Sequence, residues 1–165
     1  MKSATRSTLL IALLLGLVSF SQAATKMVAP VAPVTLRDAM SDATTLASLH
    51  ANAKVMKISG TSMHPFFGDG TLIVVKPISE SKLRVGMVVV YRNRFGETVA
   101  HRLVSRQNDS WIAKGYNNAE VDSTPVNGSN LVGVVYATFH TASSNSESLA
   151  SLNSSIDVAL AASAK

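Results

Sequence analysis

The chain has 165 residues, of which 47% are hydrophobic and 15% are charged. This composition is typical of one folded domain with a short tail, and it excludes an intrinsically disordered chain and a pair of catalytic domains. The sequence has no cysteine, which excludes disulfide scaffolds, thiolate nucleophiles and thiolate metal sites. The four histidines lie far apart without the His-x-x-x-His spacing of a zinc site, so we expect no metal and no cofactor.

Residues 1 to 23 have the pattern of a secretory signal peptide. Lys2 and Arg6 precede an apolar run from Leu9 to Phe20, and Ser21-Gln22-Ala23 places small residues at the two positions that export cleavage requires. The apolar run is about a dozen residues long, whereas crossing a bilayer takes ~20. We therefore expect export to the periplasm or the cell exterior, with cleavage after Ala23. Retention of this segment would instead anchor the chain in the membrane.

The chain is basic, with a formal net charge of +5. Removal of residues 1 to 23 would take away two basic and no acidic residues, leaving 13 basic against 10 acidic residues, or +3. Arginines in the predicted strands could form a basic face towards anionic lipid headgroups, or could be the solvent side of alternating strands. No nucleic-acid-binding motif accompanies them, so no nucleic-acid partner is expected. These arginines are Arg84, Arg92, Arg94, Arg102 and Arg106.

Residues 24 to 53 are predicted to form an extended linker followed by one amphipathic helix. Pro30 and Pro33, among alanines and valines, are typical of a linker. Thr35 and Asp38 resemble a capping box, and apolar residues then recur at helical spacing to about Ala53.

Residues 54 to 140 change to short β-type runs separated by turn residues. Glycines in the segments 66–70 and 94–97 lie where hairpin reversals need a positive φ, so we expect a mainly antiparallel β fold, either a barrel or a sandwich. The serine-rich residues 141 to 165 predict a flexible tail without chemistry. The predicted strands are 54–58, 71–76, 87–94, 97–104, 111–113 and 131–139.

Ser62 is the candidate nucleophile, in the segment Ser59-Gly60-Thr61-Ser62-Met63-His64-Pro65. It lies between a strand ending at Ile58 and a turn built by Pro65 and residues 68–70. Such a bend can expose the hydroxyl of Ser62 while the backbone N–H groups of Ser62 and Met63 point together as an oxyanion hole. Glycine, serine and proline are also ordinary turn formers, so the local sequence by itself favours a turn serine without chemistry.

Residues 60 to 75 resemble a motif of signal peptidase I, a family of the S24/S26 peptidase superfamily. Gly60-Thr61-Ser62-Met63-His64-Pro65, followed by Gly68-Asp69, is similar to its Gly-x-Ser-Met-x-Pro box, and residues 83 to 91 resemble the strand that follows in these enzymes. The resemblance covers about residues 55 to 136. It implies an antiparallel, barrel-like β catalytic fold with one short N-terminal helix, and it implies that Ser62 is the nucleophile.

The same resemblance implies a general base and an orienting carboxylate. In bacterial members the base is a lysine directly before an arginine, whereas His101-Arg102 stands at that place here, which is the pattern of the endoplasmic-reticulum and archaeal branch. Residues 114 to 123 resemble the Lys-Gly-Asp-Asn-Asn stretch and the downstream aspartate of that branch, which implies that Asp122 orients the histidine. Tyr116 stands where the family has aspartate, so local hydrogen bonding or pocket shape must differ.

Two interpretations follow from these residues. His101 could be a core histidine and Asp122 could cap a turn before Pro125. Taken with Ser62, they fit a Ser-His-Asp mechanism of acyl transfer. The resemblance then implies a serine endopeptidase that cleaves exported polypeptides after small residues, with a possible contact to the membrane surface. The alternative is a catalytically inactive binding or accessory module with a peptidase fold, suggested by Tyr116 and by the lack of the membrane-spanning segment usual in these enzymes.

Overall fold

The computed structural model describes residues 28 to 142, so the predicted signal peptide and nearly all of the predicted serine-rich tail lie outside the described residues. These residues form one helix and a six-stranded antiparallel sheet in the order β1-β2-β6-β3-β4-β5. The elements are α1 (Leu36–Ser48), β1 (Lys54–Lys57), β2 (Leu72–Lys76), the short 3-10 helix η1 (Glu80–Lys82), β3 (Val88–Arg92), β4 (Thr98–Gln107), β5 (Ser110–Lys114) and β6 (Leu131–Phe139).

The helix α1 begins at the predicted cap and ends earlier than predicted. The Thr35 side chain accepts a hydrogen bond from the Asp38 N–H at 3.1 Å, as a capping residue does. The helix ends at Ser48 rather than near Ala53, because Asn52 adopts a positive φ of 59° and turns the chain into β1. Three alanines at helical spacing are buried against Leu72 and Val74 of β2, namely Ala39, Ala43 and Ala47.

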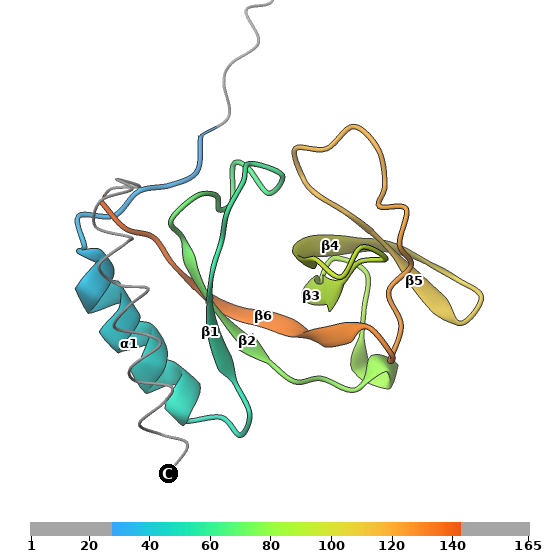
Figure 1. Ribbon diagram of the computed structural model, residues 1–165, viewed down its shortest axis with the longest axis horizontal. Helices are drawn as coiled ribbons and strands as arrows, with labels where there is room; N and C mark the ends of the chain where they lie inside the picture. Colours follow the sequence, from blue (N-terminus) through green and yellow to red (C-terminus); the bar gives the residue numbers. More distant parts are fainter. Residues whose placement is uncertain (1–27, 143–165) are drawn as a thin grey trace, which may run out of the picture.

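The sheet is antiparallel throughout but is not closed, because β1 and β5 remain its two edges. The predicted mainly antiparallel β fold with one short N-terminal helix is confirmed, and its sheet is open rather than closed into a barrel. Strand β6 pairs with both β2 and β3 and so joins a half containing β1 and β2 to a half containing β3, β4 and β5. Figure 1 shows β6 running from the half with β1 and β2 to the half with β3, β4 and β5, with the loop after β1 and the loop after β5 projecting on the same side. This arrangement brings two loops far apart in sequence close to each other.

Candidate active site

Ser62 lies in the loop that joins β1 to β2, and local hydrogen bonds fix this loop. The Ile58 N–H donates to the Thr71 carbonyl at 2.8 Å, which closes the base of the loop. The Gly60 N–H donates to Asp69 Oδ1 at 2.6 Å, and Gly60 has a φ of 97°, a left-handed conformation that favours glycine. Gly60 and Asp69 therefore shape the turn that presents Ser62.

The structure brings together the three side chains that the sequence singles out. Ser62 Oγ lies 2.8 Å from His101 Nε2, and His101 Nδ1 lies 2.6 Å from Asp122 Oδ2. His101 comes from β4 and is only 8% exposed, whereas Asp122 lies in the loop after β5, where its N–H donates to the Ala113 carbonyl at 2.8 Å. His101 is buried, as a core histidine would be, but both of its ring nitrogens have polar partners. The arrangement can move a proton from Ser62 to His101 while a carboxylate fixes the imidazole.

The predicted oxyanion-hole donors lie in a suitable turn. Neither the Ser62 N–H nor the Met63 N–H makes a hydrogen bond to any of residues 28–142. The Met63 side chain is buried and holds the turn against the core. Two backbone donors beside a candidate nucleophile are what an oxyanion hole requires, and their catalytic use remains a prediction.

The loop after β5 also holds the nucleophile turn in place. The Asn117 N–H donates to the Ser62 carbonyl at 2.8 Å, and the Asn117 side-chain amide donates to the Thr61 carbonyl at 3.2 Å. A Cβ atom added to Gly115 would lie 2.7 Å from the Ser62 carbonyl oxygen, so only glycine allows this close approach. From the sequence, a role within residues 114 to 123 was predicted only for Asp122. The Gly-x-Asn pattern was the available signal.

Tyr116, the departure from the family pattern, joins two parts of the site through its ring. Its centroid lies 4.1 Å from that of Phe66 in the loop that carries Ser62. On β4, the Arg102 guanidinium lies 4.2 Å from the same ring, directly after His101 in sequence. A small aspartate could not make these ring contacts.

The other four arginines of the predicted basic face are exposed, namely Arg84, Arg92, Arg94 and Arg106.

Tyr91 of β3 is a polar neighbour of the site that sequence reasoning missed. Its hydroxyl donates to Asp122 Oδ2 at 2.6 Å, and the residue is 1% exposed. Burial raises the pKa of Tyr91 well above its ordinary value, and the hydrogen bond to Asp122 and the negative charge of Asp122 raise it further. Tyr91 therefore remains a hydrogen-bond donor to the carboxylate. The sequence pattern indicates only a buried strand residue at this position.

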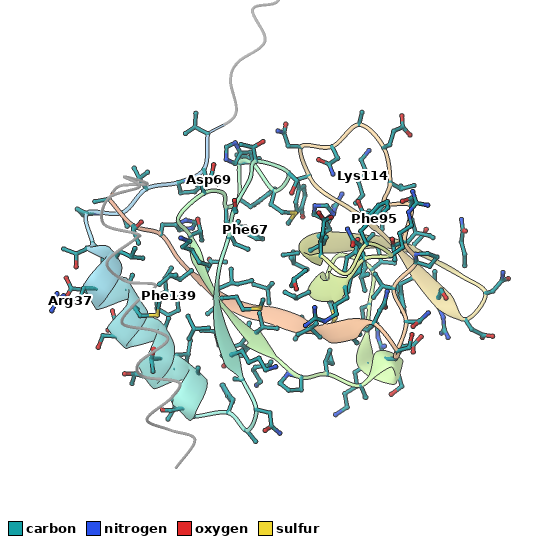
Figure 2. The ribbon with its side chains drawn as sticks, viewed as in Figure 1. Arg37, Phe67, Asp69, Phe95, Lys114 and Phe139 are labelled. Atoms are coloured by element: carbon teal, nitrogen blue, oxygen red, sulfur yellow. The ribbon has the colours of Figure 1, made fainter. Side chains whose placement is uncertain are left out.

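A cavity of about 390 Å³ opens beside Ser62 and His101. One wall is the segment 56–60, from β1 into the loop, and the facing wall is the beginning of β4, residues 98–101. Figure 2 shows Phe67 and Asp69 on the loop side of this region and Lys114 on the other half of the molecule. Apolar side chains line most of the remaining surface, namely Met63, Phe67, Ile73 and Val90.

Other kinds of site find little support in the part of the chain that the structure describes. Residues 28–142 contain no group of three His, Asp or Glu side chains that could hold a metal ion. Among the same residues there is no helix long and apolar enough to span a membrane. Lys114, the first residue of the segment 114–123 and the alternative to His101 as a base, donates from Nζ to the Ala119 carbonyl at 2.7 Å, whereas His101 contacts Ser62.

A family model described as Peptidase S24-like matches residues 19 to 136. The chain belongs to the Peptidase S24-like family. A curated relative of this Peptidase S24-like chain is "Signal peptidase I W" of Bacillus subtilis (strain 168), which is 40% identical over 75 residues. That match covers 42% of the chain and 40% of the relative, so the chain spans less than half of the relative's length. These matches support the resemblance to S24/S26-type peptidases, and the assignment to the branch with a histidine base remains a prediction.

Proposed function

We propose that this chain is a serine endopeptidase of the signal peptidase I kind, with Ser62, His101 and Asp122 as its catalytic residues. The observation that carries the proposal is the continuous hydrogen-bonded chain from Ser62 Oγ through both ring nitrogens of His101 to Asp122 Oδ2. Membership of the Peptidase S24-like family and the name of the Bacillus relative support the same reaction class.

In this mechanism the carboxylate of Asp122 accepts the Nδ1–H of His101 and so leaves Nε2 as the basic nitrogen. Nε2 takes the Ser62 proton as Oγ attacks the scissile carbonyl, and the N–H groups of Ser62 and Met63 stabilise the resulting oxyanion. His101 then gives the proton to the leaving amine. Water cleaves the acyl ester by the same route, with His101 again as base. This histidine in place of lysine is the pattern of the endoplasmic-reticulum and archaeal branch.

The substrate that suits the cavity is an extended polypeptide. Strand β1 is a sheet edge, and the register between β4 and β5 begins at Arg102 with Lys114, which leaves residues 98–101 without a β5 partner. A peptide lying between these two segments could add main-chain hydrogen bonds to either one. The apolar side chains between the two walls suit small apolar substrate residues, in keeping with cleavage after small residues.

We further propose that the chain acts in the periplasm or outside the cell. The support is the signal-peptide pattern of residues 1 to 23, and retention of that segment would keep the enzyme at the membrane. In both cases exported polypeptides would be the available substrates. Contact with the membrane surface would be aided by the four exposed arginines.

A serine-reactive fluorophosphonate probe tests the proposal. The wild-type chain should be labelled, and labelling should disappear in Ser62→Ala. Ser105→Ala, on β4 and outside the lining of the cavity, is the matched control and should be labelled like the wild type. Folded wild-type protein that takes no label would instead identify an inactive binding module.

A further inference from the structure

Tyr91 and His101 converge on one carboxylate oxygen from the same face of the sheet. In the pairing of β3 with β4, His101 lies opposite Val89 and Tyr91 lies opposite Val99. Because side chains alternate along a strand, Tyr91 and His101 are diagonal neighbours on one face. The Tyr91 hydroxyl and His101 Nδ1 both lie 2.6 Å from Asp122 Oδ2. The paired strands β3 and β4 thus hold Tyr91 and His101 in place as the two hydrogen-bond partners of Asp122 Oδ2.

The Tyr91 hydroxyl is not needed to fill the core. The ring packs in a cluster that includes Leu83, Leu103 and Val126, where a phenylalanine ring would occupy the same space. Burying a hydroxyl is unfavourable unless it is hydrogen-bonded. Within residues 28–142, the partner that offsets this cost is Asp122 alone. The hydroxyl is therefore better explained by Asp122 than by packing.

Of the three proposed catalytic residues, Asp122 is the one least firmly held in place by its own surroundings. It lies in the loop after β5 between the exposed residues Val121 and Ser123, and its backbone is tied to the sheet by one hydrogen bond to the Ala113 carbonyl. The terminal torsion of an aspartate side chain is broad, so the carboxylate can rotate unless its oxygens are held. The Tyr91 hydroxyl, supplied by a buried strand, restricts that rotation.

We infer that Tyr91 is a positioning residue of the proposed mechanism, whose hydroxyl holds Asp122 Oδ2 towards His101. This inference rests on the proposed function of Ser62, His101 and Asp122. It extends the proposed group of three side chains to a fourth that touches neither the substrate cavity nor Ser62. The raised pKa of Tyr91 keeps the hydroxyl protonated while the histidine acts as base.

The variant Tyr91→Phe removes the hydroxyl and retains the ring. We expect the maximal rate of acylation by the fluorophosphonate probe to fall about tenfold or more, because the variant loses a hydrogen bond to the charged carboxylate of Asp122. The probe concentration at half-maximal rate should not change, because Tyr91 does not line the cavity. The matched control is Tyr136→Phe, because Tyr136 lies on β6 and its hydroxyl makes no hydrogen bond within residues 28–142.

A second readout separates positioning from stability. The proton resonance of the His101 Nδ1–H reports its bond to Asp122 directly, and we expect it to shift in Tyr91→Phe and not in Tyr136→Phe. A wild-type acylation rate with an unshifted resonance would overturn the inference, even if the melting temperature falls. Absence of labelling in the wild type would refute the proposed function instead. If the wild type takes no label and the His101 Nδ1–H resonance is also unshifted in Tyr91→Phe, the contact between Tyr91 and the His101–Asp122 pair is refuted as well.

Discussion

Replacing Asp122 by Asn isolates the charge of the orienting residue. The carboxylate oxygen Oδ2 lies 2.6 Å from both the Tyr91 hydroxyl and His101 Nδ1. An amide oxygen at that place could accept both hydrogen bonds, so the fold should be kept. What disappears is the negative charge opposite the imidazolium that forms when His101 takes the Ser62 proton.

The expected loss of rate is large. Two unit charges about 4 Å apart interact by about 4 kcal/mol at an effective dielectric constant of 20, which corresponds to roughly a thousandfold in rate. The amide can also rotate and present its NH₂ group to His101 Nδ1, which would hold the imidazole in the wrong tautomer and raise the loss towards ~10⁴-fold. We therefore expect Asp122→Asn to acylate about 10³ to 10⁴ times more slowly than the wild type.

The assay is the rate of probe acylation for the wild type and Asp122→Asn at one pH, with circular dichroism to confirm the fold. Asp109→Asn is the matched control, because Asp109 is an exposed residue of the turn between β4 and β5. It should react at the wild-type rate. A folded Asp122→Asn variant that reacts within about threefold of the wild type would refute the orienting role of this carboxylate.

Two further changes test the supports of the site. Gly115→Ala would place a Cβ 2.7 Å from the Ser62 carbonyl oxygen and displace the nucleophile turn, so acylation should fall about 10- to 100-fold. Gly128→Ala, which meets only the flexible Glu80 side chain, is its control, and equal rates in the two variants would contradict this account. Because folded Tyr91 has a raised pKa, the unfolded chain loses this proton first above pH ~10, so wild-type stability should fall with rising pH more steeply than that of Tyr91→Phe. Urea unfolding between pH 8 and 11 measures this difference, and parallel curves would contradict it.

The sequence predicted the strands and the side chains that meet at the site, for different reasons. Alternation and turn glycines located the six strands to within a few residues. Ser62, His101 and Asp122 were identified through the family resemblance, since each also had an ordinary structural explanation. Helix α1 was predicted too long, because the apolar spacing continues past Ser48 while the backbone turns at Asn52.

The supporting contacts could not be predicted in the same way. Asn117 donates from its backbone N–H to the Ser62 carbonyl and from its side-chain amide to the Thr61 carbonyl, and both partners are more than 50 residues away in sequence. Tyr91 and Asp122 are 31 residues apart, and their contact depends on how the loop after β5 returns over β3. Hydrophobic periodicity reports that a side chain is buried, but it does not identify the partner of a buried hydroxyl.

Cleavage of a reporter polypeptide tests the central claim most directly. The reporter carries an apolar segment followed by a small-x-small sequence, and the full chain is incubated with it before mass spectrometry of the products. The wild-type chain should cut after the second small residue, and Ser62→Ala should leave the reporter intact. A Ser62→Ala variant that cuts at the wild-type rate, or a folded wild-type chain that neither cuts nor takes an acyl label, would contradict a Ser62-dependent peptidase.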